Sequence, residues 1–543
     1  MPTSVHNKNY LNMLLGFKLN DTELEKLLNG LGMSLEKNGA KEIEVEYQAN
    51  RPDLISTVGL ARAIRYFTGR KRSFNYKLSG YSGIVVNIND NVEKVRPYIA
   101  CMLVKNVKFT EDSLLDLINS IDKLSETFGR HRRRIAIGLH DAKRIEGNIS
   151  YGVYPNEQFE ALGGETEKYS DILENTEKGK AYAELCKTES GYCALKDSKG
   201  AMALIPVINS ERTKISESTS ELFVDVTGTN RYAVYSAANL LATNFIDMGF
   251  NVYSVSIMKR GSKTMLTPSL ARQRIEVKLE RFSEEIGTHI AFNSVIGLAN
   301  KMGYEAALRY RNIAFNVPAY RLDIINDQDI IEDIAVAYGY DYIMPLPVVS
   351  FQQGSLDPYE ETLDTLRSIV TGLGFSELMS DYMTNEKNNF LLMHVSSGNG
   401  SYIKIKNAKA NTITMLRTWL LPSLLNSMSR SQHDKLPHRL FELDLVFSLQ
   451  RSTPIEQYHL ACAISDDKVD LNEIKSIMYT LLNAVSADAK AEIRPFSSGA
   501  FIEGRCGELL VNGKRFGIFG ELSPVVLEGF GINAPVIALE IEL

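Results

Sequence analysis

Hydrophobic and polar positions along the chain repeat one pattern: apolar residues at helical spacing, a glycine between apolar neighbours, and then a strand-like run. The pattern occurs at residues 27–36, 246–255, 298–308 and 370–379. Glycine is favoured where a helix ends in the left-handed conformation, and flanking apolar residues pack against the last helical turn. The four segments share no longer similarity, so they are not repeats of a solenoid. The pattern predicts a multidomain α+β protein.

The first 80 residues predict a small module of two helices and one strand. Leucines at helical spacing predict a helix over 21–29, and alternating apolar residues predict a strand over 43–47. A second amphipathic helix is expected to follow, with Asp53 or Ser56 as its N-cap and Gly69 at its end.

The next stretch of chain predicts a larger module. Strand-like runs around 83–108 precede a helix expected over 112–128, whose leucines and isoleucines recur at helical spacing. Two further strand-like runs, ALIPVINSE at 203–211 and LFVDVTGTN at 222–230, end in small polar residues. A long helix over about 230–248 is expected to close this module.

The remaining chain continues the alternation of helices and strands. Helices are expected near 357–373 and 412–430, and an apolar run at 534–543 predicts a final strand. Breaks in these patterns divide the chain into four modules. Their expected boundaries are 1–80, 85–260, 267–345 and 350–543.

The composition is that of an ordinary globular protein. Hydrophobic residues make up 44% of the chain and charged residues 23%, and 543 residues exceed what one hydrophobic core supports. A net charge of −6 is atypical of proteins that grip nucleic acid over their whole surface, so any such role is local or shared with a partner. There is no apolar run of about 18 residues and no signal-peptide core, so we expect a cytoplasmic protein.

Cysteine and histidine spacing does not predict a zinc site. The five cysteines form no CxxC pair, which favours reduced thiols over zinc ligands or disulfides. His140, His433 and His438 have no metal-ligand spacing, so we expect ordinary polar roles for them.

Residues 323–333 read DIINDQDIIED, which places five acidic side chains in eleven positions without a lysine or arginine. By their spacing, Asp329, Glu332 and Asp333 share one helix face, and Asp323 ends the preceding strand within reach of it. Two charges about 4 Å apart repel by roughly 4 kcal/mol at an effective dielectric near 20. The cluster must therefore splay into water, bind protons or bind a cation such as Mg²⁺ or Ca²⁺. Stabilisation of first-turn acids by the helix dipole explains the same pattern without a metal.

The longer segment YRLDIINDQDIIEDIAVAYGYDYI at 320–343 resembles the B5 domain of phenylalanyl-tRNA synthetase β subunits. The resemblance implies a magnesium site at the junction with an α subunit. Its ligands would be Asp323, Asp329, Glu332 and Asp333. Asp327 falls outside the family's pattern.

Other segments resemble the same family in the same order. NRPDLISTVGLARAIRYFTG resembles its B1 module, IPVINSERTK and LFVDVTGTNRYAV resemble the B3/B4 editing module of the archaeal and eukaryotic cytosolic short type, and RLFELDLVF resembles its C-terminal module. The resemblance implies a class II synthetase-like core at 350–543, an antiparallel sheet with helices used for subunit association. It also implies an α2β2 phenylalanine–tRNA ligase that joins L-phenylalanine to tRNA(Phe) with ATP and Mg²⁺.

Activation of the amino acid is expected in the α subunit. Arg439 and Glu442 echo an Arg/Glu pair of active class II cores, but GIFGELSPVVLEGF at 517–530 offers no arginine to bind ATP phosphates. We therefore expect structural or partner contacts in this part of the chain.

An editing site has a physical reason to exist in this family, because tyrosine is phenylalanine with one added hydroxyl. An apolar pocket rejects such an isostere only about a hundredfold. A second site that offers the hydroxyl a polar partner could hydrolyse mischarged tyrosyl-tRNA. The candidate residues, which turn formation explains equally well, are Asn209, Ser210, Asp225, Thr227 and Thr229.

Loop 129–134, GRHRRR, could hold tRNA phosphates, form a solvated turn or contact a partner. Two other function classes stay open. One is a metal-dependent phosphoryl-transfer enzyme built on the carboxylates, for which only Arg321 is close enough to clamp a phosphate. The other is a stand-alone aminoacyl-tRNA deacylase or RNA-binding scaffold without an α partner.

Overall fold

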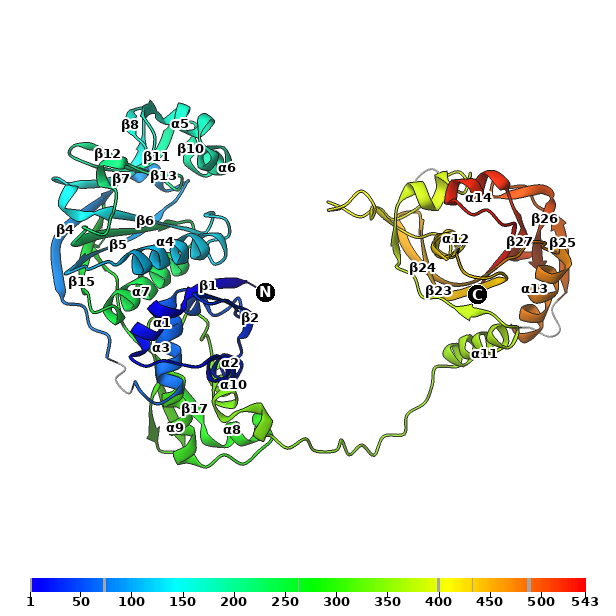
Figure 1. Cartoon of the computed structure of the whole chain (residues 1–543), viewed down its shortest axis with the longest axis horizontal. Helices are drawn as coiled ribbons and strands as arrows, with labels where there is room; N and C mark the ends of the chain where they lie inside the picture. Colours follow the sequence, from blue (N-terminus) through cyan, green and yellow to red (C-terminus); the bar gives the residue numbers. More distant parts are fainter. Residues whose placement is uncertain (1, 72–74, 262, 398–400, 432, 486–489) are drawn as a thin grey trace. The chain divides into compact units, whose positions relative to one another are not determined.

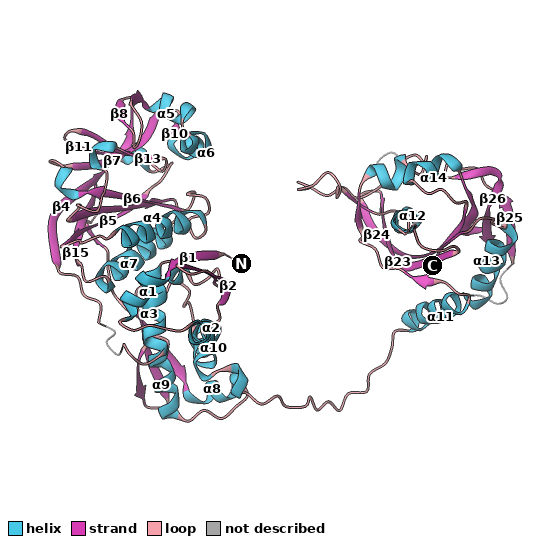
Figure 2. Cartoon of the chain, in the orientation of Figure 1, coloured by secondary structure: helices cyan, strands magenta, loops and turns pink. Residues whose placement is uncertain are grey.

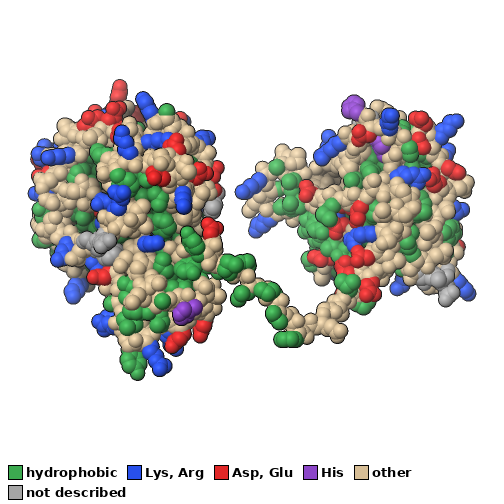
Figure 3. Space-filling view, turned by 60° about the horizontal axis from the view of Figure 1, so that its bottom comes forward, with side chains coloured by type: hydrophobic (Ala, Val, Ile, Leu, Met, Phe, Trp, Pro, Cys, Tyr) green, Lys and Arg blue, Asp and Glu red, His purple; other side chains and the backbone are tan. Residues whose placement is uncertain are grey.

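The computed structural model describes residues 2–543 except 72–74, 262, 398–400, 432 and 486–489. The chain divides into two compact units, Met1–Pro347 and Val348–Leu543 (Figure 1). Helices and strands are mixed within both units, which confirms the α+β class (Figure 2). Acidic and basic side chains are interspersed on the face that Figure 3 shows. No helix in the described part of the chain is long and apolar enough to cross a membrane.

The chain begins with a small three-stranded antiparallel sheet of order β1-β3-β2, packed with three helices. Ser56 rather than Asp53 is the N-cap of the third helix, because its hydroxyl accepts a hydrogen bond from the backbone N–H of Gly59 at 3.0 Å. Only glycine fits at position 59, where a Cβ would lie 1.7 Å from the carbonyl oxygen of Asp53. The elements are β1 (Thr3–Asn7), α1 (Lys8–Leu15), α2 (Asp21–Gly30), β2 (Ser34–Asn38), β3 (Glu42–Glu46) and α3 (Thr57–Phe67).

A large sheet of order β13-β12-β11-β7-β4-β15-β5-β14-β6 follows. Its central strands are buried on both faces: Ala100 and Met102 of β5 face one core, and Ile99 and Cys101 face the other. Two helices, α4 (Glu111–Glu126) and α7 (Arg231–Asp247), pack into the first core (Figure 1). The strands are β4 (Gly80–Ile88), β5 (Tyr98–Lys105), β6 (Ile135–Asp141), β7 (Ile149–Tyr154), β11 (Gly191–Asp197), β12 (Gly200–Leu204), β13 (Ile208–Asn209), β14 (Glu221–Gly228) and β15 (Asn251–Lys259).

The third part of the first unit is a three-stranded sheet of order β17-β19-β18 with three helices. Ile330 and Ile334 of its last helix lie in the same core as Leu28 and Leu60 of the N-terminal module, so the two modules are packed together. The elements are β17 (Gln273–Lys278), α8 (Leu279–Ile286), α9 (Phe292–Lys301), β18 (Glu305–Arg309), β19 (Asn312–Val317) and α10 (Asp327–Tyr338).

The four predicted glycine helix ends are confirmed. Each glycine has φ between +75° and +86°, and the buried apolar residue after it donates its N–H to the carbonyl five residues back. In the first of them, Met33 donates to Leu28 at 2.9 Å. The four glycines are Gly32, Gly249, Gly303 and Gly374.

The second unit is built on a seven-stranded sheet of order β20-β23-β24-β28-β27-β26-β25, in which only the β20–β23 pair is parallel. Helices α11 (Pro358–Gly372) and α13 (Leu471–Val485) pack on one face, and α12 (Leu421–Arg430) and α14 (Pro524–Phe530) pack on the other. The strands are β20 (Ser376–Glu377), β23 (His438–Gln450), β24 (Thr453–Ser465), β25 (Ala491–Pro495), β26 (Phe501–Val511), β27 (Lys514–Leu522) and β28 (Val536–Glu542).

The helix predicted over 412–430 is wrong in its first half. The helix begins only at Leu421, with Pro422 at a position whose N–H has no helical partner. Met415–Leu416 instead form a strand that pairs with Met383–Thr384. The apolar residues before Leu421 mimic helical spacing, but the tertiary strand pair decides their conformation.

Asp116 on α4 links the large sheet to the N-terminal module. Its carboxylate accepts hydrogen bonds from the backbone N–H and the hydroxyl of Thr57, at the start of α3. Burial nevertheless raises the pKa of Asp116 to about 6. Between pH of about 4 and about 6 the folded chain therefore holds a proton that the unfolded chain releases. The stability contributed by this group falls as the pH rises through that window.

Asp116→Asn is expected to remove this part of the pH dependence. As the pH rises from about 4 to about 6, the free energy of unfolding of the wild type should fall. That of the variant should fall by about 1 to 2 kcal/mol less over the same range. Denaturant unfolding of both proteins at several pH values, followed by circular dichroism, measures the difference. Parallel pH profiles for the two proteins would contradict the assignment.

Candidate functional site

Asp225 and Thr227 lie on the same face of β14 and line a narrow pocket. On the neighbouring strand β6, Gly138 is directly opposite Asp225 and Ala136 is opposite Thr227, so small residues leave space beside both polar side chains. A Cβ at position 138 would lie 2.1 Å from Oδ2 of Asp225. The turn between β12 and β13, including Pro206, closes the pocket.

The two polar side chains carry buried atoms without a partner in the protein. Asp225 is 1% exposed, and its Oδ1 has no hydrogen bond among the described residues. The hydroxyl of Thr227 is fully buried and is also unpaired among them. Leaving such a group unsatisfied costs about 1 to 3 kcal/mol. A polar group that enters this pocket would therefore find two hydrogen-bonding atoms ready to receive it.

His140 is the residue of this site that the sequence did not identify, since its spacing predicted only an ordinary polar role. The imidazole is fully buried, with Nε2 at 3.1 Å from Oδ2 of Asp225 and Nδ1 at 2.8 Å from the hydroxyl of Thr213. These contacts fix Oδ2 of Asp225 and leave Oδ1 without a partner among the described residues. Alternation along β6 places Ala136, Gly138 and His140 on one strand face, and that pattern could have indicated the site.

The other predicted editing residues have different positions. Asn209 lines the pocket, and its amide donates to the carbonyl of Leu139 at 3.1 Å. Ser210 does not line it; its buried hydroxyl accepts from the backbone N–H of Arg212 at 3.2 Å and caps a short helical turn. Thr229 lies in an adjacent cleft with loop 129–134.

The carboxylate cluster is organised by an arginine two residues before it. Arg321 is buried, and its guanidinium donates two hydrogen bonds, of 2.9 and 2.6 Å, to the carboxylate of Asp323. The same guanidinium lies 2.7 Å from Asp333, which also accepts a hydrogen bond from the hydroxyl of Tyr304. Burial opposes ionisation of Asp323, but Arg321 outweighs it and holds the pKa of this carboxyl below its usual value. Two of the four predicted ligands therefore share one counter-charge within the protein.

The other acids of this segment also have individual roles. Asp329 accepts hydrogen bonds from the backbone N–H groups of Ile325 at 2.7 Å and Asn326 at 2.8 Å, which completes a capping box at the start of α10. Asp327 pairs with Arg281 on α8. Glu332 makes no such pair among the described residues, and burial together with Asp333, Asp329 and Asp323 raises its pKa.

These contacts test whether the four residues fit a metal ion. Asp323, Asp329, Glu332 and Asp333 do line one pocket, together with Arg51 of the N-terminal module. In the described part of the chain, however, no group of three histidine, cysteine or acidic side chains is placed to hold a metal. Arg321 pairs with Asp323 and Asp333, and Asp329 is engaged in the helix cap, so in this structure the four residues are not arranged around a common ion position, and the magnesium site stays a prediction.

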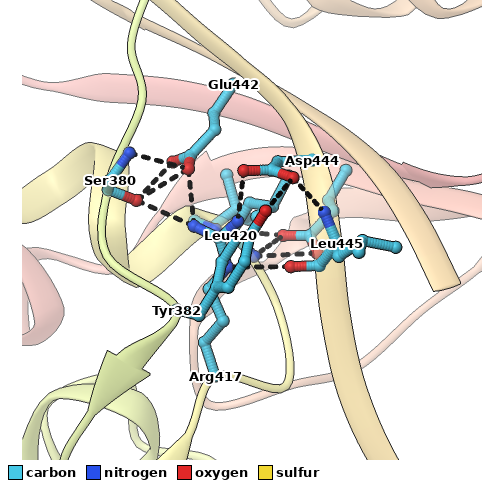
Figure 4. Close-up of polar contacts among 9 residues, drawn as sticks. Ser380, Tyr382, Arg417, Leu420, Glu442, Asp444 and Leu445 are labelled. Carbon is cyan, nitrogen blue, oxygen red and sulfur yellow. Dashed lines mark hydrogen bonds and ion pairs between the residues drawn. The ribbon is translucent and has the colours of Figure 1, made fainter. Parts of the chain in front are cut away.

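The second unit contains a buried polar cluster centred on Arg417 (Figure 4). Its guanidinium lies 2.5 Å from Glu442 and 3.2 Å from Asp444, and Ser380 donates to Glu442 at 2.7 Å. Both Arg417 and Glu442 are 1% exposed. One guanidinium thus serves as the counter-charge of two carboxylates within the protein.

Arg439 and Glu442, which echo an Arg/Glu pair of active class II cores, have separate partners in this structure. Arg439 pairs with Glu473 on α13 and lies over the ring of Phe375. On a strand, two residues three positions apart point to opposite faces of the sheet, which separates these two side chains. Glu442 therefore pairs with Arg417 and not with Arg439.

All five cysteines are free thiols. Four are buried, at positions 101, 186, 193 and 462, and Cys506 is half-buried. Burial raises the pKa of Cys193 to about 11, so this thiol is held protonated and unreactive.

Three family models match the chain over most of its length. A B3/4 domain matches residues 85–244, a tRNA synthetase B5 domain matches 275–340, and a phenylalanyl-tRNA synthetase beta chain CLM domain matches 344–543. The Asp225 pocket lies within the first match and the carboxylate cluster within the second.

Relatives align with the whole chain. A phenylalanine–tRNA ligase beta subunit of Pyrococcus abyssi is 33% identical over 100% of this chain and 99% of its own, and that of Archaeoglobus fulgidus is 32% identical over 96% and 95%. A solved N-terminal fragment of the phenylalanyl-tRNA synthetase beta subunit from Pyrococcus horikoshii matches with a TM-score of 0.60 and 31% identity, covering 62% of this chain and 100% of that chain. This chain belongs to the family of phenylalanine–tRNA ligase β subunits.

Proposed function

We propose that this chain acts as the β subunit of a phenylalanine–tRNA ligase and that its Asp225 pocket removes tyrosine from mischarged tRNA. The observation that carries the editing role is the pair of buried, unpaired polar atoms, Oδ1 of Asp225 and Oγ1 of Thr227, in one pocket. The family membership supports the role in a ligase.

The phenol hydroxyl of tyrosine is the group that this pair would recognise. Asp225 Oδ1 accepts the phenol hydrogen, and the Thr227 hydroxyl donates to the phenol oxygen. Phenylalanine would leave both atoms desolvated and unpaired. A site built to hydrogen-bond a substrate hydroxyl disfavours the analogue that lacks it by up to roughly 10⁴-fold. The correctly charged product would therefore be spared.

His140 would act as a positioning residue. By binding Oδ2 of Asp225 it directs Oδ1 to the pocket, and Thr213 in turn holds the imidazole. Asp225, Thr227 and His140 are assigned to recognition of the phenol, and none of them is assigned to activation of water.

The second unit would associate with the α subunit rather than activate amino acid. The Arg417 cluster supports this view, because its arginine is engaged by Glu442 and Asp444 instead of facing an open pocket. A sheet whose central arginine is engaged in this way suits a structural role. Phenylalanine and ATP would bind to α, and both subunits would contact tRNA(Phe).

Reconstitution with and without the α chain tests this function. The assembled complex should charge tRNA(Phe) with phenylalanine and hydrolyse tyrosyl-tRNA, whereas the isolated β chain should do no charging. An isolated monomer that hydrolyses mischarged tRNA and never binds α would support the stand-alone deacylase instead. Failure of the complex to hydrolyse tyrosyl-tRNA would reject the editing role.

Magnesium at Asp323, Asp329, Glu332 and Asp333 stays a prediction for the assembled complex. Because Arg321 already provides a counter-charge to Asp323 and Asp333, we expect the isolated chain to fold without the metal. Chelation by EDTA should leave its denaturant unfolding midpoint unchanged. A lower midpoint after chelation that Mg²⁺ alone restores would contradict this expectation and favour the metal site.

A further inference from the structure

A basic cleft, open to solvent, lies beside the Asp225 pocket. Three arginines and one histidine of loop 129–134 contribute to it, against a single carboxylate. The loop residues are Arg130, His131, Arg133 and Arg134, and the carboxylate is Glu184 of α6 (Glu177–Cys186). Thr229 and Asn230, which follow β14, complete the lining. This local excess of positive charge contrasts with the acidic balance of the chain as a whole.

Arg132 contacts residues of both the pocket and the cleft. It lines the pocket, where its guanidinium donates to the carbonyls of Pro206 at 3.0 Å and Val207 at 3.1 Å. On the other side the same guanidinium lies 4.8 Å from the ring centre of Tyr182, which lines the cleft. The two sites are also adjacent in sequence, because Thr227 at the end of β14 lines the pocket and Thr229, just after this strand, lines the cleft.

The basic loop has a defined and unusual backbone. Arg130, His131 and Arg132 have φ of +50°, +52° and +60°, a left-handed conformation that side-chain-bearing residues seldom adopt, least of all three in a row. Backbone hydrogen bonds hold it: Arg132 donates to Ser125 at 3.0 Å, and Arg134 donates to Gly129 at 2.8 Å. Strained backbone of this kind is concentrated at functional sites.

Arg96 couples this loop to the pocket strand. The side chain is buried, and its guanidinium donates to the carbonyl of Arg132 and to the carbonyl of Thr227, both at 2.8 Å. One fixed guanidinium thus joins the backbone of the basic loop to the strand that carries Thr227. The positions of the cleft and of the pocket are therefore mechanically linked.

We propose that this cleft binds the phosphates of the single-stranded 3′ end of an aminoacyl-tRNA while the aminoacyl group occupies the Asp225 pocket. The inference rests on the proposed editing function. Arg130 and Arg133 are exposed, and among the described residues neither has a carboxylate within ion-pair distance, so both are available to phosphates. The strand must be unpaired where it enters, because the pocket beside the cleft is too narrow for a duplex end.

The test uses the Arg130→Gln/Arg133→Gln double variant of the full chain, with Arg311→Gln as the matched control. Arg311 is an exposed arginine of the same unit, in the turn between β18 and β19. The probe is a short single-stranded RNA ending in CCA, and its Kd is measured by fluorescence anisotropy at several salt concentrations. The KM for tyrosyl-tRNA hydrolysis is measured in the complex with α.

The double variant should bind the RNA about tenfold more weakly or worse. Loss of two phosphate contacts should also reduce the slope of log K against log salt by about 1.4, since each contact on a single strand contributes about 0.7. KM should rise with kcat little changed, and Arg311→Gln should match the wild type. Charge reversal in Arg133→Glu should weaken binding further than Arg133→Gln.

The outcomes separate this inference from the editing function. If the wild type hydrolyses tyrosyl-tRNA and the double variant keeps its Kd, salt slope and KM, the cleft assignment is overturned. If the wild type binds the RNA without hydrolysing tyrosyl-tRNA, and the double variant does not bind the RNA, the editing function is rejected and the RNA-binding cleft is supported. Unchanged RNA binding with weakened association of a protein partner would make the cleft a protein interface and overturn the proposal.

Discussion

Replacing Asp225 with alanine is expected to lower tyrosyl-tRNA hydrolysis by about 100-fold or more, while charging with phenylalanine stays at the wild-type rate. The substitution removes the pocket's unpaired carboxylate oxygen and leaves His140 without its partner. A loss of about 2.7 kcal/mol in transition-state stabilisation corresponds to that factor. Single-turnover hydrolysis of preformed tyrosyl-tRNA by the assembled complex measures it directly.

Ser210→Ala provides the matched control for this prediction. Ser210 is the neighbour of a pocket residue in sequence, but its hydroxyl caps a turn and does not line the pocket. Removal of this hydroxyl should lower the free energy of unfolding by about 1 kcal/mol and leave the hydrolysis of tyrosyl-tRNA nearly unchanged. Equal losses of hydrolysis in both variants, or a loss of phenylalanine charging in Asp225→Ala alone, would contradict the assignment of Asp225 to tyrosine recognition.

Arg321→Leu is expected to destabilise the first unit by about 3 to 5 kcal/mol. The guanidinium is the counter-charge of both Asp323 and Asp333, and its loss would leave two buried carboxylates close together without compensation. The only tryptophan, Trp419, lies in the second unit, so its fluorescence follows that unit separately. Denaturant unfolding by circular dichroism should shift, and the tryptophan transition should not.

The pH dependence of this variant gives a second readout. In the wild type Arg321 keeps the pKa of Asp323 low, so the stability from this group is present above pH of about 4 and is lost as the pH falls through the folded pKa. Without Arg321 the largest influence that favours ionisation of Asp323 is lost, burial opposes the charged form, and protonation relieves this cost. The difference in unfolding free energy between the two proteins should therefore narrow from pH 7 toward about 4. A difference that is independent of pH, or below about 1 kcal/mol, would contradict the role of Arg321.

Local patterns were sufficient for most of the secondary structure. Gly32 and Gly249 end helices in the conformation expected, because the signal, a glycine between apolar residues, and its hydrogen bonds lie within six neighbouring positions. The pattern failed at 412–430, where the strand pair between Met415 and Thr384 comes from a distant segment. Local periodicity cannot report such a pairing.

The sites depended more on long-range contacts. Asp225, Thr227 and Asn209 were found as polar residues at strand ends, and all three line the pocket. His140 was not, because its partners Thr213 and Asp225 are 73 and 85 residues away. The number and spacing of the acidic residues suggested a cation, which stays a prediction. The sequence showed that Arg321 is close to the acidic residues, but only the fold shows that its guanidinium pairs with both Asp323 and Asp333.

The pocket's recognition of the tyrosine hydroxyl is tested most directly by a structure of the chain bound to a non-hydrolysable tyrosyl-adenosine analogue. The phenol oxygen should lie within hydrogen-bond distance of Oδ1 of Asp225 and of the hydroxyl of Thr227, with His140 still bound to Oδ2. A phenol oxygen that faces solvent, or a tyrosine ring bound outside the pocket between β6 and β14, would contradict the account.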